Sequence, residues 1–91
     1  MAKPPIDTVW NRIRASAGKP FETKTGKPFT YTVDGNVFRP SRTDYQISKA
    51  DFGTALALAP FEGPGIVSDT VRGPSYIWPV LHDSRIRQKD W

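Results

Sequence analysis

The sequence predicts a small α+β domain, in which an N-terminal helix precedes a three-stranded antiparallel meander and two further helices separated by a long loop rich in glycine and proline. Two changes of pattern predict this class. Apolar residues recur with helical spacing over residues 6–17, alternate with polar residues over 19–39, and return to helical spacing after residue 48. Because 91 residues are too few for two packed domains, we expect one compact domain over residues 1–91, with residues 1–5 as a flexible tail.

The first helix is predicted over residues 6–17. Its apolar side chains fall three or four positions apart, which places them on one side of a helix: Ile6, Val9, Trp10, Ile13 and Ala17. Pro4-Pro5 precedes this stripe, and Gly18 follows it as a C-terminal cap. We expect the stripe to be buried, which makes Trp10 a core residue.

Alternation of apolar and polar residues predicts the meander. Its three strands are centred on Phe21 and Thr23, on Phe29, Tyr31 and Val33, and on Val37-Phe38. The segment Thr25-Gly26-Lys27-Pro28 is the first turn, and Asp34-Gly35 is typical of a type I′ turn. We expect the aromatic face of the second strand to pack on the stripe of the first helix, because each surface needs an apolar cover.

The second helix has a complete start signal. Ser48 is the predicted N-cap, Asp51 follows three residues later as the acid of a capping box, and Ile47 with Phe52 forms a hydrophobic staple. We expect this helix to begin at about Lys49 and to end before Pro60. Its predicted buried stripe consists of Phe52, Ala55, Leu56 and Ala59.

Two loops flank this helix. The polar stretch over residues 41–46 predicts the first loop, with at most one further pair of strand residues at Tyr45 and Ile47. Gly63-Pro64-Gly65 and Gly73-Pro74 interrupt any regular element in the second loop. We expect three apolar residues to anchor that loop: Ile66, Val67 and Val71.

The last elements are a third helix and a final turn. Ser75 is the predicted N-cap of a helix over residues 76–82, in which Pro79 removes only one helical hydrogen bond. Its predicted stripe consists of Tyr76, Ile77, Val80 and Leu81. Asp83-Ser84 offers a further cap, and residues 85–89 predict a final turn.

Composition excludes several classes of protein. The chain has no cysteine and one histidine, which excludes a disulfide scaffold and a cysteine zinc site and argues against a histidine metal site. No stretch approaches the ~18 apolar residues of a membrane span, and none resembles a signal peptide. We therefore expect a monomeric cytoplasmic protein with no metal, no cofactor and no membrane contact.

No catalytic constellation is evident. His82 and Asp83 are adjacent, with Ser75 or Ser84 as conceivable nucleophiles, but neighbouring residues on a helix point in different directions. The acidic residues are dispersed, and the glycines lack the pattern of a phosphate-binding loop. The sequence therefore favours a binding module over an enzyme.

Positive charge is the strongest functional signal. The formal net charge is +4, and residues 1–30 hold six basic and two acidic residues, whereas the rest of the chain is neutral. A basic hairpin tip beside a basic helix face is how winged domains hold a phosphate backbone. We therefore expect DNA or RNA phosphates to be bound by Arg12, Arg14, Lys19, Lys24 and Lys27, with Arg39 and Arg42 extending the patch.

The similarity to winged-helix modules concerns layout alone. The connection between the second and third predicted helices, about 15 residues, is far longer than the 3–4 of a helix-turn-helix. A protein-interaction module, either an inhibitor or a subunit of a small assembly, is the alternative. It would use the exposed sheet face, the long loop and three aromatic residues: Trp78, Phe38 and Phe61. Salt dependence separates the two hypotheses, because phosphate contacts weaken steeply with salt and an apolar interface does not.

Overall fold

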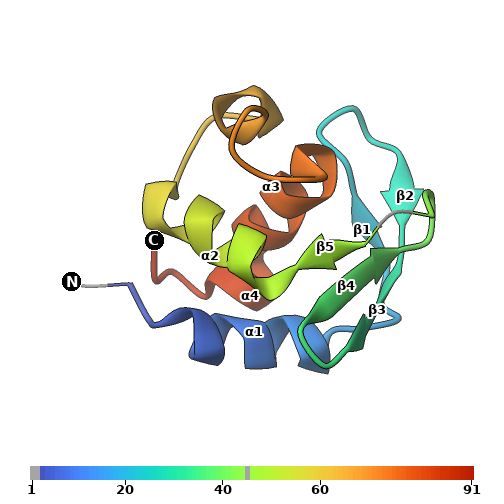
Figure 1. Ribbon diagram of the computed structural model, residues 1–91, viewed down its shortest axis with the longest axis horizontal. Coiled ribbons are helices and arrows are strands. Elements are labelled where there is room, and N and C mark those ends of the chain that lie inside the picture. The colour runs from blue at the N-terminus through green and yellow to red at the C-terminus, as the bar shows by residue number, and fades with distance from the viewer. Residues whose placement is uncertain (1–2, 45) are drawn as a thin grey trace.

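The computed structural model describes residues 3–44 and 46–91, and it has the predicted α+β architecture with a helix first (Figure 1). Within these residues, two antiparallel sheets have the strand orders β1-β2 and β3-β4-β5. The helices are α1 (Ile6–Ala15), α2 (Lys49–Leu58), the 3₁₀ helix η1 (Pro64–Val67), α3 (Pro74–His82) and α4 (Ser84–Arg87). The strands are β1 (Phe21–Glu22), β2 (Pro28–Phe29), β3 (Tyr31–Asp34), β4 (Val37–Pro40) and β5 (Ile47–Ser48).

Helix α1 buries the predicted stripe at Val9, Trp10 and Ile13. Trp10 Nε1 donates a hydrogen bond to the carbonyl of Gly35 at 2.9 Å, which satisfies the one polar atom of this buried side chain. The helix ends before Ala17, and that side chain is exposed, so its predicted place on the buried stripe is wrong. The chain has already turned away at this point, because the N–H of Gly18 donates to the carbonyl of Tyr31.

The predicted meander is divided between the two sheets. Phe21 pairs with Phe29 in the first sheet, whereas the second sheet pairs β3 with β4 and β4 with β5. The division falls at Thr30, whose N–H donates to Ser41 Oγ at 3.0 Å and whose carbonyl accepts from the N–H of Ser41 at 2.8 Å. Strand β5 supplies the third strand of the second sheet. Tyr45, where a strand residue was expected, and residues 1–2 of the expected tail lie outside the described residues.

The second hairpin turns one residue later than predicted. Asp34 pairs with Val37, so the two-residue turn is Gly35-Asn36 and not Asp34-Gly35. Gly35 has φ +62°, whereas Asn36 has no positive φ. A type I′ turn needs a positive φ at both central residues, so the predicted turn type is also wrong. Glycine takes the strained first position of the turn, where a Cβ is disfavoured.

The core is a continuous cluster that joins both sheets to the helices. Within it five aromatic rings form a row in which each ring contacts the next, with centroids 4.4–5.5 Å apart. The order in the row is Trp10, Phe52, Phe38, Tyr31 and Phe21. Tyr31 Oη donates to the carbonyl of Ile13 at 2.6 Å, which confirms that β3 packs on α1. Figure 1 shows the strands at the end of the molecule opposite the C-terminus, with α1 running beneath α2.

Helix α2 begins as predicted. The N–H of Asp51 donates to Ser48 Oγ at 3.1 Å, and the residues of the predicted staple, Ile47 and Phe52, are both fully buried. The Asp51 carboxylate accepts instead from the N–H of Arg72 at 3.1 Å, so it tethers the second loop to α2. All four residues of the predicted stripe are buried.

The second loop and the start of α3 correct two expectations. Val67 and Val71 are buried, but Ile66 is 60% exposed, because η1 directs it outward. Helix α3 begins at Pro74 with Gly73 as its N-cap, so Ser75 is not the cap. Proline suits the first helical position, and glycine adopts the left-handed conformation observed at residue 73, with φ +66°.

The chain ends on a short helix. Asp83 caps α4 as predicted, because its carboxylate accepts from the N–H of Arg85 at 2.9 Å. This helix ends at Arg87, earlier than the final turn predicted over residues 85–89. None of the helices in the described ranges has both the length and the apolarity that crossing a bilayer requires.

Candidate nucleic-acid interface

The predicted basic residues do not form one continuous patch. Arg12 Nη2 lies 2.6 Å from the carboxylate of Asp90, and its Nη1 donates to the carbonyl of Ile86 at 3.0 Å. Arg12 therefore fastens the C-terminal segment to α1. Arg39 forms an exposed pair with Asp34 at 3.8 Å, across the second hairpin. The charges of these two arginines are already matched by carboxylates.

Two other predicted residues lie apart from the first hairpin turn. Arg14 is exposed on α1, with Nη2 3.4 Å from the carbonyl of Gly35. Lys19 lines a shallow pocket between α1 and α4 together with Arg12 and Arg85. Arg85 is itself held by two bonds from its guanidinium to the carboxylate of Asp83, at 2.8 and 2.9 Å.

The remaining three predicted basic residues do converge. Lys24, Lys27 and Arg42 line one pocket of about 470 Å3, which we call the hairpin pocket. No acidic residue is among the described residues that line it, and none of its three basic side chains has an ion-pair partner in the described ranges. Its other lining residues are Thr23, Thr25, Pro64, Ser75 and Tyr76.

An ordered turn presents the two lysines. The N–H of Thr23 donates to the carbonyl of Lys27 at 2.9 Å, and the N–H of Gly26 donates to the carbonyl of Thr23 at 2.9 Å. The N–H of Lys27 also donates to Thr23 Oγ1 at 3.1 Å. Gly26 has φ +87°, a conformation that side chains disfavour, which explains the glycine between the two lysines.

Residues outside the β1–β2 turn also contact Lys24. Lys24 Nζ donates to the carbonyl of Glu62 at 3.2 Å and lies 5.8 Å from the centroid of the Trp78 ring, as in a cation–π contact. Figure 1 shows the β1–β2 turn leaning toward the segment that contains η1 and the start of α3. The position of Lys24 therefore depends on residues far away in sequence.

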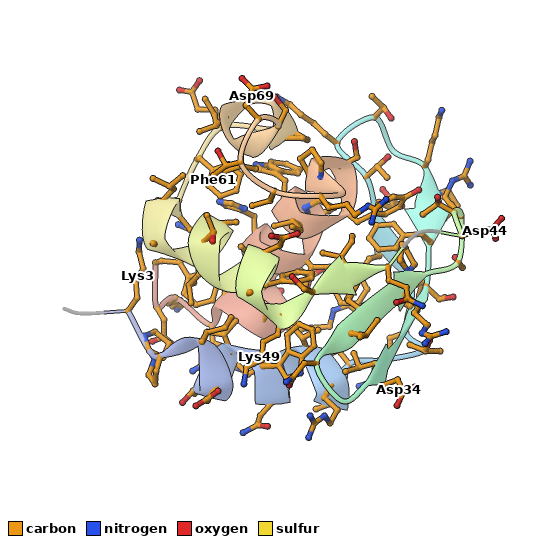
Figure 2. The ribbon with its side chains drawn as sticks, in the orientation of Figure 1. Lys3, Asp34, Asp44, Lys49, Phe61 and Asp69 are labelled. Atoms are coloured by element: carbon orange, nitrogen blue, oxygen red, sulfur yellow. The ribbon has the colours of Figure 1, made fainter. Side chains whose placement is uncertain are left out.

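Arg42 enters the hairpin pocket from the loop after β4. Its Nη1 donates to the carbonyl of Pro28 at 3.3 Å, while the rest of the guanidinium has no partner among the described residues. Asp44 lies on the same loop but is not among the residues that line the pocket. Figure 2 shows its side chain at the outer edge of the molecule.

The aromatic residues predicted for a protein interface are all engaged in packing. Phe38 is fully buried between Tyr31 and Phe52, so it is not on the surface where a protein partner would contact it. Trp78 and Phe61 are half-buried, and Trp78 Nε1 donates to the carbonyl of Phe61 at 2.9 Å. The large apolar side chains that are exposed in the described ranges are Leu58, at 51%, and Ile66, at 60%.

His82 and Asp83 do not contact each other through a catalytic hydrogen bond. Both ring nitrogens of His82 are engaged with backbone groups, Nε2 with the N–H of Phe61 and Nδ1 with the carbonyl of Trp78. Hydrogen bonds from the Arg85 side chain lower the pKa of Asp83 and engage both oxygens of its carboxylate. Over the described parts of the chain, no three acidic or histidine side chains are grouped closely enough to hold a metal ion.

Comparison with known proteins gives no relative. No protein-family model matches this chain, and neither a curated protein nor a solved structure matches it. The functional argument therefore depends on the geometry of the pockets and of the charged side chains.

Proposed function

We propose that this domain is a non-enzymatic binding module that holds the phosphate backbone of nucleic acid in the hairpin pocket. The observation that carries the proposal is the convergence of Lys24, Lys27 and Arg42 on one concave site that has no carboxylate among its described lining residues. Like charges repel, so three cations gathered without a counter-charge favour an anionic ligand.

The chemistry of the pocket suits phosphate oxygens. A guanidinium can present two N–H groups in parallel to a phosphate, and ammonium groups supply compact positive charge. The hydroxyls of Thr25 and Ser75 add hydrogen-bonding groups on opposite walls. These contacts are to phosphate alone, so we expect binding with little preference for base sequence.

Fluorescence anisotropy with a labelled DNA duplex and a labelled single strand, from about 50 to about 300 mM salt, tests this proposal. Each phosphate contact adds about −0.9 to the slope of log affinity against log salt for the duplex and about −0.7 for the single strand, so we expect the affinity to fall as the salt concentration rises. Lys27→Gln should weaken binding, whereas Lys89→Gln, which removes the same charge outside the pocket, should have a much smaller effect. Equal effects of the two substitutions would contradict binding in the pocket.

A protein-interaction module remains the second candidate, and one observation favours it. Leu58 and Ile66 expose 51% and 60% of their surfaces, although the burial of large apolar side chains away from water is favourable. A partner that covers them would bind with little dependence on salt, and Leu58→Ser with Ile66→Ser would abolish that binding. The same pair of substitutions should leave oligonucleotide binding unchanged.

A further inference from the structure

We infer that the hairpin pocket takes the terminal phosphate monoester of a nucleic-acid strand in preference to an internal phosphodiester. This inference rests on the proposed function and specifies which phosphate is bound. It follows from three properties of the pocket: the concentration of its charge, its walls and the lack of a basic track leading away from it.

The positive charge is concentrated in one place. Lys24, Lys27 and Arg42, which carry one formal charge each, all line a single pocket. An internal phosphodiester carries one negative charge, whereas a monoester carries between one and two near neutral pH, because its second pKa is ~6. The monoester is therefore the better electrostatic match for this set of cations.

The predicted basic residues outside the pocket do not continue it as a track, and Arg14 lies apart on α1, beside the carbonyl of Gly35. Arg12 and Arg39 are paired with Asp90 and Asp34, and Lys19 lies in the separate pocket between α1 and α4. A strand bound along its length gains affinity from many regularly spaced phosphates. Here the unpaired charge would contact one phosphate group and little of the strand beyond it.

The pocket has walls on opposite sides. The β1–β2 turn forms one wall, while Pro64, Ser75 and Tyr76 form the other. The wall at Tyr76 is braced from behind, because its ring packs edge-to-face on Phe29, with centroids 5.1 Å apart. Walls from two distant segments leave less room for a chain that enters and leaves the pocket than for a strand that ends in it.

The number of acceptors also favours a monoester. A terminal phosphate presents three non-bridging oxygens, and an internal one presents two. The residues that carry donors come from three segments of the chain, with the two lysines on the β1–β2 turn, Arg42 on the loop after β4, and Ser75 on α3. The third oxygen gives this arrangement one further charge-assisted hydrogen bond, which is worth about tenfold or more in affinity.

The test compares single strands of one sequence that differ only at their ends: one with a 5′-phosphate, one with a 3′-phosphate, and one with hydroxyls at both ends. Each carries an internal fluorophore, and affinity is measured by anisotropy with the full chain. We expect at least one phosphorylated strand to bind about tenfold more tightly than the hydroxyl strand. This preference should disappear in Lys27→Gln and in Arg42→Gln but persist in Lys89→Gln. Circular dichroism of each variant establishes that it is folded.

The other outcomes separate the two proposals. Equal affinity for all three strands, reduced equally in Lys27→Gln, would overturn the preference for strand ends and leave backbone binding intact. No binding of any strand at low salt would overturn both. Inorganic phosphate that competes at the same concentration as the phosphorylated strand would show that free phosphate is the ligand, and this would overturn the assignment to strand ends. Competition only at far higher concentration would support it.

Discussion

The backbone N–H of Phe61 donates a hydrogen bond of 3.1 Å to Nε2 of His82. Since Nε2 accepts, the proton of the neutral ring is on Nδ1, which donates to the carbonyl of Trp78 at 2.9 Å. The Phe61 carbonyl in turn accepts from Trp78 Nε1, so two side chains one helical turn apart on α3 hold both polar groups of one loop residue. The next residue, Glu62, accepts a hydrogen bond from Lys24. The bonds of Trp78 and His82 to Phe61 therefore also help to position a residue of the hairpin pocket.

The first prediction concerns pH. Burial lowers the pKa of His82 below its usual 6.5, and nearby Arg87 contributes in the same direction, against the opposing effect of the hydrogen bond to Trp78. The unfolded chain therefore binds a proton more readily than the folded chain. The stabilising contribution is fully present above pH 6.5 and is lost as the pH falls below that value.

Urea unfolding at a series of pH values between about 8 and about 5 measures this effect. We expect the free energy of unfolding of the natural chain to decrease below pH 6.5, and that of His82→Gln, which has no titrating ring, to change less across the same range. Identical pH dependence in the two proteins would show that His82 is not responsible. The lowered pKa of Asp83 affects stability only at more acidic pH, below its ordinary value of 3.8.

The second prediction separates the position of Lys24 from the stability of the fold. A Cβ added at Gly63 would lie 2.6 Å from Lys24 Nζ, so Gly63→Ala must displace the end of that flexible side chain. We expect weaker oligonucleotide binding with nearly unchanged stability. Gly65→Ala is the matched control, because a Cβ there meets nothing within 4 Å. Equal affinities of the two variants would contradict a role for Lys24 in the pocket.

The third prediction concerns the helix starts. Ser48→Ala should lower the free energy of unfolding by about 1 kcal/mol, because Ser48 Oγ accepts the N–H of Asp51. Ser75→Ala should change it by less than about 0.5 kcal/mol, because Gly73 occupies the N-cap of α3 and Ser75 is exposed. Urea unfolding of both variants measures the difference. A larger loss for Ser75→Ala would show that α3 is capped by serine after all.

The fourth prediction compares two ion pairs. Arg12→Gln should destabilise the protein by about 1–2 kcal/mol, because it breaks a partly buried pair with Asp90 and a hydrogen bond to the Ile86 carbonyl. Arg39→Gln breaks an exposed pair of 3.8 Å and should cost less than about 0.5 kcal/mol. Thermal unfolding of the two variants, which lose the same charge, measures which substitution destabilises the protein more. Similar midpoints would contradict the role of Arg12 in holding the C-terminal segment.

Sequence patterns predicted those features that depend on neighbours along the chain. The start of α2 at Ser48 and the buried stripe of α1 are local, because capping and helical spacing involve residues within a few positions. The break at Thr30 was missed because it depends on Ser41, which is 11 positions away and is placed beside Thr30 by the second hairpin. The cap of α3 was missed because the serine signal at Ser75 competes with Gly73-Pro74, and the proline sets the first helical position.

The candidate site was predicted in part. The sequence placed Lys24 and Lys27 on one hairpin turn and gave Arg42 as an extension of the basic patch, and in the structure all three residues line one pocket. Sequence alone could not show that Asp90 neutralises Arg12, since these residues are 78 positions apart. The support of Lys24 by Glu62 is likewise a contact between distant segments. Figure 2 shows Phe61 on that same connecting segment.

The most direct test of the hairpin pocket is a backbone-amide NMR titration of the isotope-labelled chain with a single strand carrying a terminal phosphate, at about 50 and about 300 mM salt. The account predicts chemical-shift changes at residues 23–27, Arg42, Ser75 and Tyr76, which diminish at the higher salt concentration. Shifts confined to the surroundings of Leu58 and Ile66, or no shifts at the lower salt concentration, would contradict it.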